Sequence, residues 1–113
     1  MCTRAELDII MEEVIQQVSQ LLGDKLNSVI LFGSYARGDN TEDSDIDIML
    51  ILDCSKAQSL TYRGNISQIA SRIGLSHDVV VSILLRDKQD FDDKVNYMSF
   101  YRNIAQEGIK IYG

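Results

Sequence analysis

The N-terminal segment has the hydrophobic spacing of an amphipathic helix. Apolar residues recur there at intervals of three and four: Leu7, Ile10, Met11, Val14, Val18, Leu21 and Leu22. Residues with this spacing share one face of an α-helix, which can pack on a core. Thr3 is a suitable N-cap, and Gly23 is a typical helix end. The pattern predicts a helix from about Thr3 to Leu22.

Short apolar runs farther along the chain are typical of buried strands. The predicted strands are Leu26–Phe32, Ile46–Leu52, Asp78–Leu85 and a short closing strand at Ile109–Tyr112. Helical spacing returns between them. The further predicted helices are Ala57–Ile73, closed by Gly74, one that starts near Asp87 or Phe91, and one around Ser99–Glu107 that ends at Gly108.

The junction between the first two strands carries the residues with the clearest chemistry. A turn that starts with Gly33-Ser34 follows the first strand, and Asp45-Ile46-Asp47 opens the second. Side chains alternate along a strand, so Asp45 and Asp47 point the same way. Two such carboxylates repel each other unless a cation lies between them, and oxygen ligands of this kind suit Mg²⁺ or Mn²⁺.

The turn supplies groups that complement the carboxylates. Gly33 lets the backbone approach a ligand closely, and Ser34 is placed to cap a short helix whose first N–H groups can bind an anion. Arg37 adds a positive charge; a surface ion pair with Glu42 or Asp43 is the alternative. Together the turn and the carboxylates predict a site for a metal-bound triphosphate.

This prediction constrains the topology. The Gly-Ser end of the first strand has to meet the start of the second, so these strands should be antiparallel. The helix predicted between the second and third strands would be a crossover connection, which joins parallel strands. We therefore expect an α+β domain in two layers, with a small mixed sheet and helices on one side. The 113 residues fit one compact domain, 1–113.

Composition narrows the range of partners. The formal net charge is −6, and Lys and Arg are scattered singly, so the chain lacks the basic stripe of a nucleic-acid-binding protein. No apolar stretch has the length of a membrane span, and no signal peptide pattern follows Met1. Cys2 and Cys54 have no metal-type spacing, and reduced thiols in a cytoplasmic protein are the simplest interpretation.

The central motif resembles the signature of the DNA polymerase β nucleotidyltransferase superfamily, and the short chain resembles its minimal members. The resemblance implies the polymerase β-like fold, ATP as substrate and a third carboxylate on a later strand, a role that falls to Asp78. It also implies two Mg²⁺ ions, one on Asp45 and Asp47 and one shared with Asp78, for in-line transfer of a nucleotide. Gly33, Ser34 and Arg37 would bind the phosphates.

Minimal nucleotidyltransferases also resemble the antitoxin of toxin–antitoxin pairs whose toxin is a HEPN-type RNase. The resemblance implies transfer of AMP from ATP to a tyrosine of that toxin. A different class remains open, in which the chain neutralises its partner by steric contact without catalysis. Transfer to a small molecule is disfavoured, because no acceptor-binding domain is visible. No residue of the sequence indicates which base is bound.

Several residues near these motifs have simpler interpretations. His77 is expected at a strand entry rather than in catalysis. Glu107-Gly108 resembles a recurring ending of the minimal enzymes, but a glycine at a helix end explains it without a function. An aromatic cluster that includes Tyr97, Phe100 and Tyr101 is expected to pack in the core rather than to bind a partner.

Overall fold

The computed structural model describes residues 3–113, so that Cys2 lies outside the described residues. Its central element is a four-stranded sheet with the order β3-β2-β1-β4. The strands are β1 (Leu26–Phe32), β2 (Ile46–Leu52), β3 (Val81–Asp87) and β4 (Ile109–Tyr112). β1 is antiparallel to both β2 and β4, whereas β2 and β3 are parallel. The predicted mixed sheet, its strand directions and the closing strand are confirmed.

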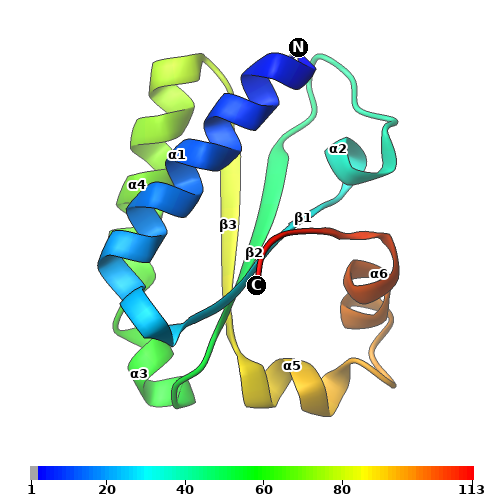
Figure 1. Ribbon diagram of the computed structural model, residues 1–113. Coiled ribbons are helices and arrows are strands. Elements are labelled where there is room, and N and C mark those ends of the chain that lie inside the picture. Colours follow the sequence, from blue (N-terminus) through cyan, green and yellow to red (C-terminus); the bar gives the residue numbers. More distant parts are fainter. Residues whose placement is uncertain (1–2) are drawn as a thin grey trace.

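The helices are distributed over both faces of the sheet. They are α1 (Arg4–Leu22), α2 (Ser34–Arg37), α3 (Lys56–Leu60), α4 (Arg63–His77), α5 (Lys88–Lys94) and α6 (Ser99–Glu107), with a 3₁₀ turn at Gly23–Lys25. Figure 1 shows α1 and α4 on one side of the sheet and α5 and α6 on the other. The α+β class is confirmed, but the expectation that helices lie on one side is wrong.

Strand alternation explains why both faces are covered. Ile46, Ile48 and Leu50 point into a core formed with α1 and α4. Met49 and Ile51 point the opposite way, into a smaller core with Phe91, Tyr101 and Ile104 of α5 and α6. β2 is a central strand that is apolar on both faces, and each face needs a helical layer to exclude water.

α1 begins where the sequence predicts it. Thr3 is the N-cap, and its hydroxyl accepts a hydrogen bond from the Glu6 N–H at 3.1 Å. The apolar stripe from Leu7 to Leu22 is buried against the sheet. In residues 3–113, no helix combines the length and the apolar character that crossing a membrane would require.

The segment after β2 differs from the single predicted helix. It is broken at Thr61 and Tyr62 into α3 and α4, and α4 continues through Gly74 to His77. Nε2 of His77 lies 3.0 Å from Oε1 of Glu13, which joins the last turn of α4 to α1. His77 is therefore a helix residue that contacts α1, and it does not open a strand.

Candidate active site

The turn after β1 is built around the backbone of Gly33. This residue is the N-cap of α2, with φ 74° and ψ −155°, a backbone conformation that residues other than glycine rarely adopt. The Gly33 carbonyl accepts hydrogen bonds from the N–H groups of Ala36 and Arg37, each at 3.1 Å. Ser34 is the first residue of the helix, so the expectation that Ser34 caps it is wrong. The short helix itself is as predicted.

The register of the sheet brings this turn to the carboxylates. Phe32, which directly precedes Gly33, is paired with Asp47 of β2. A Cβ atom added at Gly33 would collide with Oδ2 of Asp47, so the Asp47 carboxylate packs directly on the glycine backbone. The structure thus brings Gly33 and Asp47 together, as the sequence predicts, and it explains why position 33 needs a glycine.

The carboxylates form an electrostatically strained pair. Asp45 is exposed and directly precedes β2, and Asp47 is half-buried on the same face of that strand. Burial raises the pKa of Asp47, and the negative charge of Asp45 raises it further, while Arg37 lowers it. A divalent cation would relieve this repulsion. Two carboxylates together with substrate phosphates are a donor set that Mg²⁺ commonly takes, so these residues fit such an ion.

Asp78 does not occupy the position predicted for it. It is the C-cap of α4, with left-handed φ 53° and ψ 46°, and β3 begins only at Val81. In the parallel pair, Asp47 is opposite Ser82, and the Ile46 N–H donates to the Val80 carbonyl. Among residues 3–113, no group of three or more carboxylate, His or Cys side chains is gathered closely enough to hold a metal ion.

The local packing explains where the chain turns. Gly74 is buried in α4, and a Cβ at this position would lie 2.7 Å from the Val79 carbonyl oxygen. The absence of a side chain lets the chain fold back over the end of the helix, where the Val79 N–H donates to the Gly74 carbonyl at 3.0 Å. Asp78 lies in the segment where the chain folds back over the end of α4. It therefore precedes β3 and is not its first residue.

Arg37 lies at the edge of the turn. Its Nε donates to Oδ2 of Asp39 at 3.2 Å, and its Nη1 lies 3.9 Å from Oε2 of Glu107. Neither Glu42 nor Asp43, the alternative partners, is the one observed. The Arg37 side chain is 46% exposed, so these ion pairs are weak and can be exchanged for a phosphate group.

A cavity of about 390 Å³ lies between this turn and α6. Its lining residues are Phe32, Gly33, Ser34, Arg37, Asp47, Phe100, Asn103, Ile104 and Glu107. Volumes of this order accommodate small-molecule ligands. The sequence predicts one wall of the cavity and gives little sign that α6 forms the other. The recurring Glu107-Gly108 ending was the one available signal, and Glu107 indeed lines the cavity beside Arg37.

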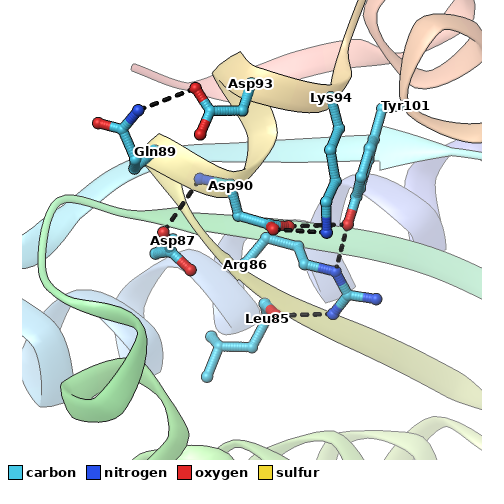
Figure 2. A network of polar contacts seen from close by, with 8 residues as sticks. All are labelled: Leu85, Arg86, Asp87, Gln89, Asp90, Asp93, Lys94 and Tyr101. Carbon is cyan, nitrogen blue, oxygen red and sulfur yellow. Dashed lines mark hydrogen bonds and ion pairs between the residues drawn. The ribbon is translucent and has the colours of Figure 1, made fainter. Parts of the chain in front are cut away.

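A polar network fixes α6 against α5 and β3. Figure 2 shows Tyr101 of α6, whose hydroxyl accepts from Nε of Arg86 at 2.9 Å and donates to Oδ2 of Asp90 at 3.0 Å. Lys94 lies 2.6 Å from Oδ1 of the same Asp90. The hydrogen bond from Lys94 lowers the pKa of Asp90, and that from Tyr101 lowers it further. The network holds one wall of the cavity in place.

The structure thus places a glycine turn against the Asp47 carboxylate, with Asp45 two residues earlier in the chain and a cavity of ligand size beside the turn. Comparison with known proteins gives the family: residues 11–111 match the model of the nucleotidyltransferase domain. The chain belongs to this family, and it is a nucleotidyltransferase.

Two curated relatives come from Methanocaldococcus jannaschii. The chain is 33% identical to "Putative protein adenylyltransferase MJ0604" over 101 residues, which cover 89% of this chain and 93% of the relative. It is 40% identical to "Putative protein adenylyltransferase MJ0141" over 83 residues, 74% of this chain and 82% of the relative. The similarity extends over most of each protein.

Solved structures share the fold. A "putative nucleotidyltransferase from Sulfolobus solfataricus" superposes with a TM-score of 0.58 at 23% identity, over 90% of this chain and 76% of the other. A structure described as "the toxin-antitoxin with AMP-PNP" superposes with a TM-score of 0.54 at 20% identity, over 90% of this chain and 73% of the other. These comparisons confirm the predicted nucleotidyltransferase fold.

Proposed function

We propose that this nucleotidyltransferase transfers AMP from ATP to a hydroxyl group of a protein partner. The observation that carries the proposal is the register of β1 and β2, which pairs Phe32 with Asp47 and packs the Gly33 turn on the Asp47 carboxylate. The two relatives named as protein adenylyltransferases, which align over most of the chain, support ATP as the donor and a protein as the acceptor.

Each side of the site has its own task. Asp45 and Asp47 would hold Mg²⁺, which neutralises charge on the triphosphate when it is bound. The hydroxyl and the N–H of Ser34, the first residue of α2, would bind phosphate oxygens, because the first N–H of a helix has no acceptor within the helix. Arg37 would exchange its weak pair with Glu107 for a phosphate oxygen.

The reaction is a substitution at the α-phosphorus of ATP. The acceptor oxygen forms a bond to this phosphorus, and the bond from phosphorus to the bridging oxygen of the β-phosphate breaks. Pyrophosphate leaves, and the hydroxyl proton passes to solvent. The chain contributes by holding the triphosphate in line with the acceptor, an effect that accounts for much of enzymatic phosphoryl and nucleotidyl transfer.

We further propose that the acceptor is a tyrosine of a HEPN-type RNase toxin and that the chain acts as its antitoxin. The family resemblance implies this acceptor, and two structural neighbours are described as toxin–antitoxin complexes. A protein acceptor also suits the charge of the chain: at a net charge of −6, a nucleic-acid acceptor would be repelled.

Transfer of label from ATP tests the proposal. The chain is incubated with Mg²⁺, ATP labelled at the α-phosphate and the protein encoded by the neighbouring gene. We expect label on that protein, released as AMP-tyrosine after hydrolysis. The label should vanish with Asp45→Ala or Asp47→Ala. Asp43→Ala is the matched control, since Asp43 is an exposed carboxylate of the same loop outside the cavity, and it should leave labelling intact.

The same variants distinguish the proposed transfer from steric neutralisation when the toxic activity of the partner is measured together with its labelling. If the chain neutralises its partner by contact alone, neutralisation survives both Ala substitutions and no label appears on any protein. That result would overturn the proposed reaction while leaving the fold assignment in place.

A further inference from the structure

The walls of the cavity between α2 and α6 differ chemically. The turn and β2 contribute Gly33, Ser34 and Asp47, the groups proposed for the metal and the phosphates. α6 contributes Phe100 and Asn103, which carry no charge, and Glu107, which pairs with Arg37. A nucleoside triphosphate has the same division, with an anionic tail and a flat, neutral base.

Phe100 is more exposed than Phe91 and Tyr101, the buried aromatic residues of the α5–α6 layer. Its neighbour Tyr101 is 5% exposed and packs in the core, whereas Phe100 is 44% exposed and lines the cavity. In the predicted cluster of Tyr97, Phe100 and Tyr101, core packing therefore accounts for Tyr101 alone, and the expectation that the whole cluster lies in the core is wrong. An exposed aromatic ring on the wall of a cavity is a stacking platform for a base.

The ring of Phe100 is held in a defined orientation. Its centroid lies 5.9 Å from that of Phe32 at an interplanar angle of 88°, and 5.7 Å from that of Tyr101 at 52°. Phe32 directly precedes Gly33, so the ring contacts the residue from which the phosphate-binding turn begins. Preorganised aromatic surface costs little conformational entropy on binding.

Asn103 lies one helical turn after Phe100, on the same face of α6. Within residues 3–113 its side-chain amide makes no hydrogen bond, so its donor and its acceptor are both available to a ligand. An amide that offers a donor beside an acceptor matches the N6–H₂ and N7 edge of adenine. Guanine shows two acceptors at that edge.

The position of α6 is fixed independently of any ligand. The Tyr101 hydroxyl is held between Arg86 of β3 and Asp90 of α5, and Figure 2 shows these side chains converging on it. Phe100 is adjacent to Tyr101 in the chain, so the network also sets where the stacking ring lies relative to β1.

We propose that α6 forms the base subsite of this enzyme, with adenine stacked on Phe100 and its edge bound by Asn103. The proposal rests on the proposed use of a nucleoside triphosphate, and it adds the residues that select the base. Phe100 and Asn103 are specificity-determining residues, while the phosphate groups bind at Gly33 and Ser34.

Two probes separate the base subsite from the phosphate site. Calorimetry measures the affinities for ATP and for tripolyphosphate, each with Mg²⁺. Phe100→Ala should weaken ATP binding about tenfold or more, the usual cost of a lost base–aromatic stack, and leave tripolyphosphate binding within about twofold. Tyr97→Ala is the matched control, because Tyr97 is an aromatic residue that is 66% exposed and lies outside the cavity. It should change neither affinity.

Two further variants exclude indirect effects. Phe100→Leu keeps an apolar contact with Phe32 but offers no aromatic ring, and it should weaken ATP binding as Phe100→Ala does. Phe100→Tyr keeps the ring and should restore the affinity. Asn103→Ala should bring the affinities for ATP and GTP to within about threefold of each other.

The outcomes that overturn the inference differ from those that overturn the proposed function. Unchanged ATP affinity in Phe100→Ala, or equal losses for ATP and tripolyphosphate, would show that α6 does not bind the base. If the unsubstituted chain binds neither probe, the proposed nucleotide site itself fails.

Discussion

The two faces of the sheet differ in how their residues are used. Among residues 3–113, the face covered by α1 and α4 has sixteen buried apolar residues in one core, whereas the α5–α6 face has six. The second face instead carries the Asp47 carboxylate, the cavity and the Arg86–Tyr101–Asp90 network.

The first face therefore contributes mainly to stability, whereas the second face carries the residues proposed for the reaction. Apolar burial on the first face provides most of the hydrophobic free energy, which scales with the area removed from water. The second face can then keep a half-buried carboxylate with a raised pKa beside Asp45, an arrangement that opposes folding. Substitutions on the two faces should therefore affect different measurements.

The largest effect is expected on the site face, at Asp47. Asp47→Asn should lower the rate of nucleotide transfer about 10²–10³-fold, because a metal ligand contributes several kcal/mol to the transition state. Without Mg²⁺ the variant should unfold at a higher temperature than the unsubstituted chain, because the repulsion with Asp45 is removed. Single-turnover kinetics and thermal unfolding measure the two effects.

Ile48 provides the matched control on the opposite face. It is the next residue of β2, is fully buried and points into the α1–α4 core. Ile48→Ala should reduce the free energy of unfolding by about 2–5 kcal/mol and leave the affinity of the folded protein for ATP unchanged. A lower unfolding temperature in Asp47→Asn together with weaker ATP binding in Ile48→Ala would contradict the proposed division of roles between the two faces.

Gly33→Ala should have the next largest effect. The added methyl group would collide with the Asp47 carboxylate, and alanine is strained at φ 74°. We expect transfer to slow by about 100-fold, the effect of displacing a catalytic group by about 1 Å. Gly64→Ala is the control: Gly64 is in α4 with open space around it, and the change should stabilise the helix by about 0.5–1 kcal/mol. Equal transfer rates in Gly33→Ala and Gly64→Ala would show that transfer does not depend on the close packing of Gly33 on Asp47.

The Asp90 carboxylate should make the α5–α6 layer sensitive to acid. Its pKa is lowered from the ordinary value of 3.8 by hydrogen bonds from Lys94 and Tyr101, so its charged form stabilises the fold. This contribution is complete above about pH 4 and is lost as the pH falls through the lowered pKa. Asp90→Asn should cost about 1 kcal/mol at pH 7, and the difference should shrink at pH 3 in denaturant titrations. If Asp90→Asn costs the same free energy of unfolding at pH 7 and at pH 3, the charge of Asp90 is not the cause of the cost.

The smallest effect is expected at Asp78. Asp78 is the C-cap of α4, and among residues 3–113 it belongs to no group of three side chains that could hold a metal ion. We therefore expect Asp78→Ala to change the transfer rate by less than about threefold. The family resemblance predicts a loss as large as that of Asp47→Asn. A large loss would show that residues 78–80 move to Asp45 and Asp47 when nucleotide is bound.

The fold could be predicted to the extent that it depends on local patterns. The stripe of α1 and the apolar runs of β1 and β2 specify their own structure. The Gly-Ser and Asp-x-Asp motifs then determine that these strands are antiparallel. The sequence does not predict the second helical layer. Met49 and Ile51 face the side opposite Ile48, and a continuous apolar run does not show that both faces of a strand are covered by helices.

Only one half of the candidate site can be predicted from the sequence. Gly33, Ser34, Asp45 and Asp47 are close in sequence, and their spacing predicts a site for a metal-bound triphosphate. Phe100 and Asn103 reach the cavity through the packing of α6 on β1, which no short motif encodes. Gly74 has the pattern of a helix end, but it lies inside α4, where its missing side chain lets the chain fold back over the helix. Asp78 therefore precedes β3 and does not open it.

The central claim is that the Gly33 turn and the carboxylates of Asp45 and Asp47 act as one site for a metal-bound triphosphate. Calorimetric titration of ATP into the chain, with Mg²⁺ and then with a chelator, tests it most directly. We predict binding that requires the metal and is lost in Asp47→Asn. Binding of equal affinity in the chelator, or unchanged binding in that variant, would contradict the account.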